Sequence, residues 1–310
     1  MMRKVSFVIP CYKSENTIES VVHEIISTCE KTHDDYEIIL VNDCSPDGLQ
    51  TVINRLTNDP RVKAITFAKN FGQHAGMMAG LRASTGEYVI VLDDDGQCPV
   101  CEYPQLLGAI YNGSDVAFAG YGRQQQSYFK NLCSDLHVFV FNRITDKPKN
   151  IQMTNFIAFS RTAVNTITEY KGPYPIISGL IFRSFRNVVN VPMTERKRTY
   201  GNTTYSLRKL FELWVNAFTA FSILPLRFAT FCGAIASMGG VIYAIYIIVF
   251  KGMGYETMSG WASIISVILI MGGLILLVLG ICGEYIGRIF MSLNNTPQYI
   301  IKEEININND

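Results

Sequence analysis

The sequence predicts an α/β protein in which an open and largely parallel sheet precedes two helices that cross a membrane. Two observations predict this fold class. Over roughly the first 120 residues, short apolar runs alternate with segments of helical periodicity, as expected for successive strand–helix units. Near the other end, the segments 228–250 and 257–283 contain no Asp, Glu, Lys or Arg, which is typical of membrane spans.

Four strands are expected in the first part of the chain. Their apolar runs are continuous rather than alternating, which indicates parallel strands that are covered on both faces. Ser14 is the expected cap of the first helix. Sheets of this kind bind ligands beyond the carboxyl ends of their strands. The expected strands are 5–9, 36–41, 62–67 and 87–92, and the helices between them are 14–30, 47–56 and 72–83.

The pattern is weaker after residue 120. A helix rich in aromatic residues is expected at 127–144, and strands are expected at 151–160 and 188–191. Residues 205–224 have large apolar side chains on one helical face and charged side chains on the other. This pattern predicts an amphipathic helix in the membrane interface, and the alternative is an ordinary helix of the preceding domain.

The two charge-free segments predict a membrane hairpin. At about 1.5 Å per residue, each is long enough to cross a hydrocarbon core of about 30 Å. The connector 251–256 holds one basic residue, Lys251, whereas several Lys and Arg residues flank the outer ends. The positive-inside rule therefore places both termini in the cytoplasm, as in a multi-pass protein of the inner (cytoplasmic) membrane. The alternative is a pair of buried core helices, but soluble cores rarely contain such long spans without a charge.

The chain is expected to divide into a cytoplasmic α/β domain, an interfacial helix, two transmembrane helices and a cytoplasmic tail. These parts are 1–200, 201–225, 226–290 and 291–310. Because 27 Lys and Arg residues stand against 26 Asp and Glu residues, no basic surface predicts nucleic acid as a partner.

The eight cysteines are expected to be reduced in the cytoplasm. Cys98 and Cys101 have the C-x-x-C spacing of metal and redox sites, but no second pair accompanies them. Two ordinary thiols in a loop are the alternative interpretation.

The fourth expected strand ends in three consecutive aspartates, Asp93, Asp94 and Asp95. Three like charges this close repel each other and resist burial, and a cation would remove that repulsion. Asp93 and Asp95 can reach the same divalent ion, and Mg²⁺ prefers few carboxylates together with water and phosphate oxygens. The pattern therefore predicts a metal that joins these acids to a nucleotide diphosphate. A lone D-x-D sequence is also common on solvated loops, and its position at a strand end makes the metal site the stronger interpretation.

The second expected strand ends in Asn42-Asp43-Cys44-Ser45-Pro46-Asp47-Gly48. Asp43 could bind a ribose or a base edge at this strand end. The same residues also make a good turn, so both interpretations stay open.

Four motifs, taken in order, resemble those of the family 2 glycosyltransferases. They are most similar to the polyprenyl-phosphate sugar transferases, the branch of dolichol-phosphate mannose synthase and the bacterial undecaprenyl-phosphate transferases. The likeness continues beyond the sheet into a basic segment and the end of the second apolar span. The matching stretches are V-S-F-V-I-P-C-Y-K-S-E, I-I-L-V-N-D-C-S-P-D-G, N-F-G-Q-H-A-G-M-M-A-G-L, V-L-D-D-D-G-Q, R-K-R-T-Y-G-N-T-T-Y-S-L-R-K-L and G-E-Y-I-G-R-I-F.

The resemblance implies a glycosyltransferase A fold, Rossmann-like, for the catalytic domain 1–200, and a nucleotide sugar as donor. It also implies site residues in three groups. Those at the nucleotide are Pro10, Tyr12, Glu15, Asn42, Asp43 and Asp94; the metal-side acids for Mg²⁺ or Mn²⁺ are Asp93 and Asp95; and Gln97, Arg123, Lys130 and Arg198 lie at the sugar, the diphosphate or the acceptor phosphate. Of these, Asp93, Asp95, Gln97 and Arg198 are the expected catalytic residues. The alternative for the basic residues is a surface attracted to anionic lipid.

The resemblance further implies metal-dependent, inverting transfer of one sugar to a polyprenyl phosphate such as undecaprenyl phosphate. This acceptor is already ionised at neutral pH, so positioning and charge neutralisation suffice without a general base. His74 is an alternative candidate for a base. The sequence leaves the sugar, the nucleobase and any homo-oligomer open.

Three features depart from the family pattern. Asn42 stands where many members have Asp, and Cys98 and Cys101 replace the usual D-P-P-E surroundings. Asn155 lies where many members have an acid in a G-D-F-R-like run, which puts a family role for that acid in doubt.

Other functions were weighed against this one. One is a transferase that extends a lipid-linked sugar or a glycolipid, and another is a catalytically silent membrane scaffold, against which the intact acid motif argues. A processive polysaccharide synthase fits less well, because neither Trp214 nor Trp261 lies in the Q-x-x-R pattern of that branch.

Overall fold

In the computed structural model, the described residues are 4–121, 148, 151–194, 196, scattered positions within 229–253, 260–294 and 296–307. The chain forms two compact units. The first comprises Met1–Lys209 and Asn295–Asp310, and the second comprises Leu210–Asn294. The expected helices at 127–144 and 205–224 lie outside the described residues.

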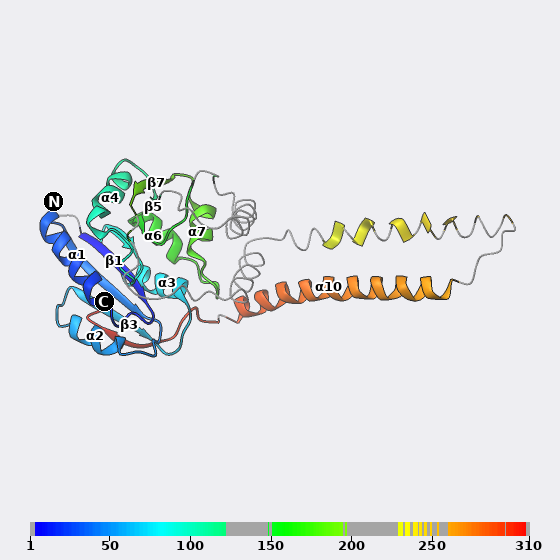
Figure 1. Ribbon diagram of the computed structural model, residues 1–310, viewed down its shortest axis with the longest axis horizontal. Helices are drawn as coiled ribbons and strands as arrows, with labels where there is room; N and C mark the ends of the chain where they lie inside the picture. Colours follow the sequence, from blue (N-terminus) through cyan, green and yellow to red (C-terminus); the bar gives the residue numbers. More distant parts are fainter. Residues whose placement is uncertain are drawn as a thin grey trace. The chain divides into compact units, whose positions relative to one another are not determined.

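The first unit is built on an eight-stranded mixed sheet (Figure 1). Strands β4, β1, β2 and β3 are parallel neighbours, whereas β6 and β8 run antiparallel to the strands that they pair with. The strand order is β7-β5-β6-β4-β1-β2-β3-β8. The strands are β1 Lys4–Cys11, β2 Asp35–Asn42, β3 Val62–Phe67, β4 Tyr88–Val91, β5 Val116–Tyr121, β6 Ile157–Ser160, β7 Val188–Met193 and β8 Ile301–Ile305.

Helices cover both faces of the sheet in two separate hydrophobic layers. Alternate residues of a strand serve opposite layers, so that Phe7 packs in one layer and Val8 in the other. One layer includes α1 Ile18–Thr32, α2 Leu49–Leu56, the short helix η1 Val100–Glu102 and α4 Tyr103–Tyr111; the other includes α3 Gln73–Ala83, α6 Arg161–Thr168 and α7 Ile177–Ser184.

The four strands expected in the first part of the chain are confirmed, and they pair in parallel as predicted. The predicted cap is wrong. Helix α1 begins at Ile18, and its N-cap residue is Thr17. The backbone carbonyl of Ser14 instead accepts hydrogen bonds from the amides of Thr17 and Ile18. Ser14 therefore closes a turn before the helix rather than capping it.

Glycines let helix α3 pack unusually close to strand β1. A Cβ atom added to Gly80 would overlap Val8 Cγ1, and one added to Gly76 would lie 3.1 Å from Pro10 Cβ. The glycines of the G-M-M-A-G stretch are therefore required by packing, because larger side chains at these positions would push α3 away from β1. The close approach brings the start of α3 near the carboxyl end of β1.

The C-terminal tail forms the last strand of the sheet. Strand β8 pairs with β3 and covers what would otherwise be an open edge. The Tyr299 ring stacks on Phe67 with ring centroids 5.0 Å apart, and the Gln298 amide donates to the carbonyls of Tyr170 and Gly172. Only a cytoplasmic tail was predicted for residues 291–310, because the exposed residues of this edge strand show no apolar pattern.

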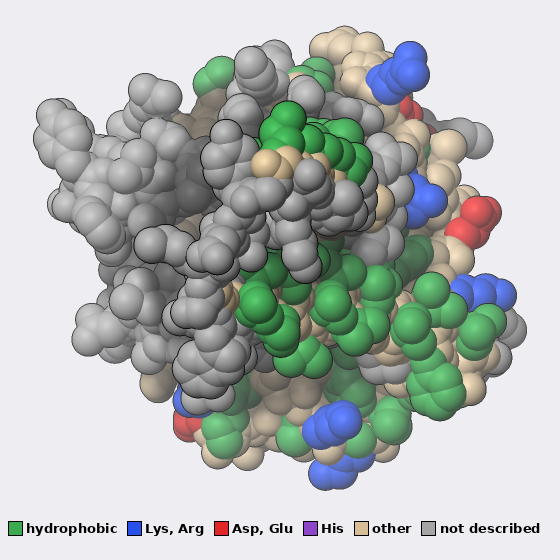
Figure 2. Space-filling view, turned by 90° about the vertical axis from the view of Figure 1, so that its right-hand side faces the viewer, with side chains coloured by type: hydrophobic (Ala, Val, Ile, Leu, Met, Phe, Trp, Pro, Cys, Tyr) green, Lys and Arg blue, Asp and Glu red, His purple; other side chains and the backbone are tan. Residues whose placement is uncertain are grey.

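Among the described residues of the second unit, one helix is long and apolar enough to cross a membrane. Helix α10, Trp261–Leu293, has 33 residues and is therefore about 50 Å long, and the apolar window Ile270–Gly287 lies within it, unburied. Its exposed side chains include Ile268, Leu276 and Leu279. A shorter apolar helix spans Ala229–Gly240. Figure 2 shows hydrophobic side chains gathered on the face turned toward the viewer.

Replacing Gly80 by Ala should destabilise the first unit by about 1–3 kcal/mol, because the added methyl group overpacks the contact with Val8. Thermal unfolding in detergent measures the effect. Gly108→Ala is the matched control, since a Cβ there meets nothing within 4 Å in helix α4. Equal melting temperatures for the two variants would contradict the close packing.

A buried acid makes the stability of this unit depend on pH. Burial alone would raise the pKa of Glu37, but hydrogen bonds from Ser6, Lys63 and Thr85 outweigh it and lower that pKa to about 2. The Glu37 carboxylate also pairs with Lys63 at 2.9 Å and Lys4 at 3.2 Å. Because the folded pKa lies below the unfolded value, the stabilisation is present above about pH 4.3 and is lost as the pH falls toward 2.

The ionised Glu37 should contribute on the order of 3 kcal/mol to the free energy of unfolding at neutral pH. The free energy of unfolding, measured with denaturant between pH 7 and pH 2, should therefore fall more steeply with decreasing pH for the wild type than for Glu37→Gln. Glu19→Gln removes an exposed partner of Arg55 and should leave the slope nearly unchanged. A Glu37→Gln variant with the wild-type slope would refute the assignment.

Candidate active site

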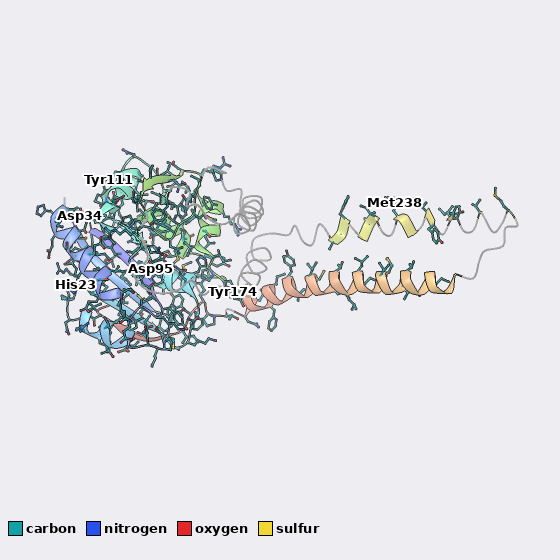
Figure 3. The ribbon with its side chains drawn as sticks, viewed as in Figure 1. His23, Asp34, Asp95, Tyr111, Tyr174 and Met238 are labelled. Carbon is teal, nitrogen blue, oxygen red and sulfur yellow. The ribbon has the colours of Figure 1, made fainter. Side chains whose placement is uncertain are left out.

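The carboxyl ends of β1, β2 and β4 meet at one edge of the sheet. Strand β1 lies between β2 and β4, and the register pairs Cys11 with Asn42. The polar segments that follow these three strands therefore converge. Figure 3 labels Asp95 in this region of the first unit.

Two side-chain amides hold Asp93, the first acid after β4. Gln73 Nε2 donates to Asp93 Oδ1 at 2.6 Å, and Asn155 Nδ2 donates to Asp93 Oδ2 at 3.0 Å. Gln73 is the first residue of α3, and Asn155 lies just before β6. The neighbouring Thr154 hydroxyl donates to the Ala119 carbonyl in β5, which ties the Asn155 segment to the sheet.

The other two acids have different partners. Asp94 Oδ2 accepts a hydrogen bond from the Tyr12 amide at 3.0 Å, which joins the ends of β4 and β1. Asp95 Oδ1 accepts from the Gln97 amide at 3.0 Å, in a turn that Gly96 permits with a φ of +75°. Asp93 and Asp94 are thus held by contacts to other elements, and Asp95 is held within its own loop.

Burial and mutual repulsion dominate the electrostatics of these acids. Burial, together with the charges of Asp95 and Asp94, raises the pKa of Asp93 to about 6 against the opposing hydrogen bonds from Asn155 and Gln73. Burial also raises the pKa of Asp94. Among the described residues, no Lys or Arg forms an ion pair with Asp93 or Asp94. Asp93 and Asp94 therefore lack a compensating cation among the described residues.

The donor set fits a divalent cation that takes few protein ligands. Carboxylate oxygens suit Mg²⁺ and Mn²⁺, and Mg²⁺ usually keeps several waters and phosphate oxygens. Within the part of the chain that the structure describes, no group of three or more His, Cys, Asp or Glu residues could enclose a metal by itself. Asp93 and Asp95 are thus suited to an ion that shares its coordination with a substrate.

Asp43 connects the tip of β2 to the start of α3. Its two carboxylate oxygens accept hydrogen bonds from the amides of Phe71 at 2.6 Å and Gly72 at 2.8 Å. Burial raises its pKa. These contacts are to the start of α3 and lie outside the expected turn. Within that turn the Ser45 amide donates to Asn42 Oδ1 at 2.9 Å, and contact of Asp43 with a nucleotide stays a prediction. By holding the start of α3, Asp43 also positions Gln73 beside Asp93.

The other predicted nucleotide residues lie at the tips of β1 and β2. Asn42 is buried and donates to Gln50 Oε1 at 2.7 Å, so it braces the second strand end. Glu15 accepts from the Gly48 amide at 2.9 Å, which joins the two tips. Pro10 is buried, whereas the Tyr12 side chain is exposed at this edge. Contact of these residues with a nucleotide stays a prediction.

Two non-glycine residues at these tips have positive φ angles, namely Lys13 at 58° and Cys44 at 52°. Such left-handed backbone costs energy and is often found at functional sites. Neighbouring contacts maintain it here, because the Lys13 amide donates to Ser45 Oγ at 2.7 Å.

Gln97 contacts the beginning of the basic segment. Its side-chain amide approaches the Arg196 carbonyl at 3.4 Å, and its own carbonyl accepts from the Arg196 amide at 3.2 Å. The Arg196 guanidinium pairs with Glu24 at 2.8 Å. Arg123, Lys130 and Arg198 lie outside the described residues.

The two loop cysteines have different surroundings. Burial raises the pKa of Cys98 to about 12, so this side chain stays a protonated thiol near neutral pH. Cys101 is exposed, and its sulfur lies 3.2 Å from an Arg196 nitrogen. The contacts described for Cys98 and Cys101 thus involve different partners and give no support to a joint metal or redox site.

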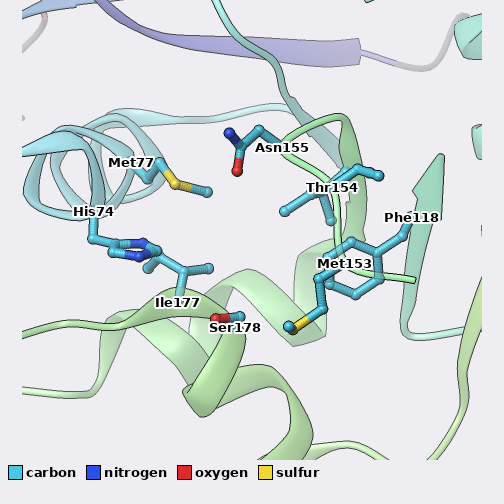
Figure 4. A pocket seen from close by; sticks show the side chains of 9 residues that line it. His74, Met77, Phe118, Met153, Thr154, Asn155, Ile177 and Ser178 are labelled. Carbon is cyan, nitrogen blue, oxygen red and sulfur yellow. The ribbon is translucent and has the colours of Figure 1, made fainter. Parts of the chain in front are cut away.

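A cavity lies beside Asn155, between α3 and α7 (Figure 4). His74 and Met77 line it from α3, and Ser178 lines it from α7. Burial lowers the pKa of His74 to about 4, so its imidazole is neutral and a weak base near pH 7.

Sequence reasoning missed Gln73 and the contact of Asn155 with Asp93. Gln73 stood inside a quoted motif, but nothing in its type distinguishes it from a surface glutamine. Asn155 was noted only as a departure from an acid. The available signal was the replacement itself. An asparagine at a position where an acid is usual can donate a hydrogen bond, which indicates a carboxylate partner nearby.

A model described as Glycosyl transferase family 2 matches residues 6–168. The chain is 29% identical over 306 residues to the Uncharacterized glycosyltransferase YkcC of Bacillus subtilis (strain 168), covering 98% of this chain and 95% of that one. It is 27% identical over 310 residues to the Undecaprenyl-phosphate 4-deoxy-4-formamido-L-arabinose transferase of Proteus mirabilis (strain HI4320), covering 99% and 95%.

A solved structure shares the fold. It is glucosyl-3-phosphoglycerate synthase from Mycobacterium tuberculosis, in complex with Mn²⁺, uridine-diphosphate-glucose and phosphoglyceric acid. The TM-score is 0.51 at 19% sequence identity, and the match covers 70% of this chain and 78% of the other.

Replacing Asn155 by Asp should destabilise the metal-free protein by about 1–3 kcal/mol at pH 7.5. The change removes a hydrogen bond to Asp93 and places a fourth carboxylate beside it. Melting temperatures in EDTA measure the loss. Asn58→Asp, at an exposed position, is the control, and an equal effect of the two changes would contradict the contact with Asp93.

Proposed function

The chain belongs to glycosyl transferase family 2, and we propose that it transfers a single sugar from a nucleotide-sugar donor to a polyprenyl phosphate such as undecaprenyl phosphate. The observation that supports this most strongly is the acid motif Asp93 to Asp95, which is held at the carboxyl end of β4 by contacts to α3, to the end of β1 and to the segment before β6. The likeness to the Proteus transferase extends over 99% of this chain, so it includes the second unit as well as the sheet.

The nucleotide would bind over the ends of β1 and β2. Tyr12 has 45% of its surface exposed there and offers an aromatic face for a base, and the buried Pro10 would line the same side. Glu15, Asn42, Asp43 and Asp94 would complete this side of the site. Asp94 supports it indirectly through its bond to the Tyr12 amide.

The diphosphate would lie at Asp93 and Asp95 together with a divalent metal, Mg²⁺ or Mn²⁺. The solved relative of the same fold binds Mn²⁺ and a nucleotide sugar, which supports a metal of this kind. When bound, such an ion neutralises the charge that develops on a departing diphosphate. Gln73 and Asn155 hold the Asp93 carboxylate in one orientation, so less reorganisation is needed when the substrate binds.

The acceptor needs little help from an acid or a base. A polyprenyl phosphate is ionised near neutral pH, and its oxygen can attack the anomeric carbon on the side opposite the diphosphate. That geometry inverts the anomeric centre. Gln97 would lie beside the sugar or the diphosphate, and the cationic residues Arg123, Lys130 and Arg198 would bind the phosphates.

A polyprenyl acceptor implies a location at the cytoplasmic face of the inner membrane. The apolar helix α10 supports membrane association. We propose that it pairs with the apolar segment 228–250 in a hairpin that leaves both termini in the cytoplasm. An interfacial helix at 201–225 and a tail at 291–310 complete the proposed arrangement.

Purified enzyme should move label from one of a panel of radiolabelled nucleotide sugars into the organic phase when undecaprenyl phosphate is supplied. Asp95→Ala and Asp93→Asn should lower the rate at least about a hundredfold, because charge neutralisation is usually a large part of catalysis at such sites. EDTA should abolish transfer, and added Mn²⁺ or Mg²⁺ should restore it.

Asp35→Asn, at an exposed position at the start of β2, is the control and should keep the wild-type rate. The proposal fails if no donor yields labelled lipid, or if Asp95→Ala transfers sugar at the rate of the control. A labelled lipid of larger size than a monosaccharide product would instead favour extension of a lipid-linked sugar.

A further inference from the structure

The cavity beside the acid motif has a volume of about 190 Å³ and lies on the face of the sheet that carries α3 and α7 (Figure 4). It adjoins the motif through one residue, because Asn155 both lines the cavity and donates to Asp93. Drug-sized ligands occupy pockets of roughly 300 Å³ or more. The space therefore suits one small ring or its substituents.

Among the residues that the structure describes, the cavity lining contains no Lys, Arg, Asp or Glu. A phosphate or a carboxylate placed against this part of the wall would be desolvated without a partner of opposite charge, which is costly. Most of the described wall is apolar, formed by side chains such as Met77, Met153 and Ile177. The described wall therefore favours an uncharged group with an apolar part over the acceptor phosphate.

Four polar side chains interrupt the apolar wall, and one of them, Thr154, already donates its hydroxyl to the Ala119 carbonyl. His74 Nδ1 is buried and has no hydrogen-bond partner among the described residues, and burial keeps the imidazole neutral by lowering its pKa to about 4. The Ser178 hydroxyl and the Asn155 side chain line the same space. A buried nitrogen without a partner destabilises a protein unless a ligand or water completes its bonding.

We propose that this cavity receives the sugar of the donor, and that His74 and Ser178 select an uncharged sugar with an apolar substituent, such as a deoxy or an acylated amino position. The inference rests on the proposed function: the sugar is bonded directly to the diphosphate, and Asn155 contacts Asp93 and also lines the cavity, so a diphosphate at Asp93 and Asp95 would have its sugar beside this cavity. The neutral imidazole supplies a hydrogen bond to the sugar and takes no part in proton transfer. The uncharged described wall disfavours uronic acids and sugars with a free amino group.

Binding by the full-length enzyme separates sugar recognition from nucleotide recognition. Calorimetry with Mn²⁺ would measure the affinity for UDP and GDP, and for their neutral, deoxy, N-acetylated, amino and uronic acid sugar derivatives. His74→Leu should weaken the binding of the preferred nucleotide sugar about tenfold, as expected for one lost hydrogen bond. Its affinity for the matching nucleoside diphosphate should stay within about twofold of wild type.

Ser178→Leu fills part of the cavity and should weaken the binding of the nucleotide sugar more strongly. The affinity for the nucleoside diphosphate should again stay unchanged. If that variant does not fold, Ser178→Ala and His74→Asn test the same contacts with smaller changes. His23→Leu is the matched control, because His23 is exposed on α1 (Figure 3) and the change should alter neither affinity.

The outcomes distinguish this inference from the proposed function. If label reaches the lipid but the cavity variants affect nucleotide sugar and diphosphate equally, or neither of them, the inference is wrong and the transfer stands. If no label reaches the lipid but the variants weaken the nucleotide sugar alone, the cavity assignment holds and the acceptor assignment falls. A preference for a uronic acid or a free amino sugar, or no binding of any nucleotide sugar, overturns the inference.

Discussion

The repulsion among three adjacent carboxylates is the constraint on which the rest of the site depends. Asp93, Asp94 and Asp95 follow one buried strand. Amides of other elements hold Asp93 and Asp94, and the amide of Gln97 in the same loop holds Asp95. Amides orient these carboxylates but carry no net charge, and burial, followed by the charges of Asp95 and Asp94, raises the pKa of Asp93. Under the proposed function, a cation that arrives with the substrate offsets these charges.

The fold supplies this arrangement through a chain of contacts that begins away from the acids. Gly76 and Gly80 allow α3 to approach β1. Asp43 then fixes the first turn of α3 through the amides of Phe71 and Gly72, and Gln73 at that helix start reaches Asp93. On the other side, Thr154 ties the segment with Asn155 to β5. The orientation of one carboxylate therefore depends on packing across three strands.

Features that arise from neighbouring residues could be predicted from the sequence, and those that arise from distant contacts could not. The continuous apolar runs predicted the four parallel strands, and the strand ends predicted that Asp93 and Tyr12 lie at one edge. The reversal of β6 and the pairing of β8 with β3 depend on partners far along the chain. The clamp on Asp93 was missed for the same reason, since Gln73 and Asn155 are 82 residues apart in the sequence and meet only at that carboxylate.

The central claim is that Asp93 and Asp95 bind a divalent ion together with a nucleotide diphosphate. Electron–nuclear double resonance of Mn²⁺ in the presence of a nucleoside diphosphate tests it directly, because a phosphate oxygen bound to the ion brings its phosphorus nucleus close enough for a resolved hyperfine coupling. The account predicts this coupling in a complex of protein, ion and nucleotide, and its loss from that complex in Asp95→Asn. Tight binding of the nucleotide in EDTA, or an unchanged protein-bound Mn²⁺ signal in Asp95→Asn, would contradict it.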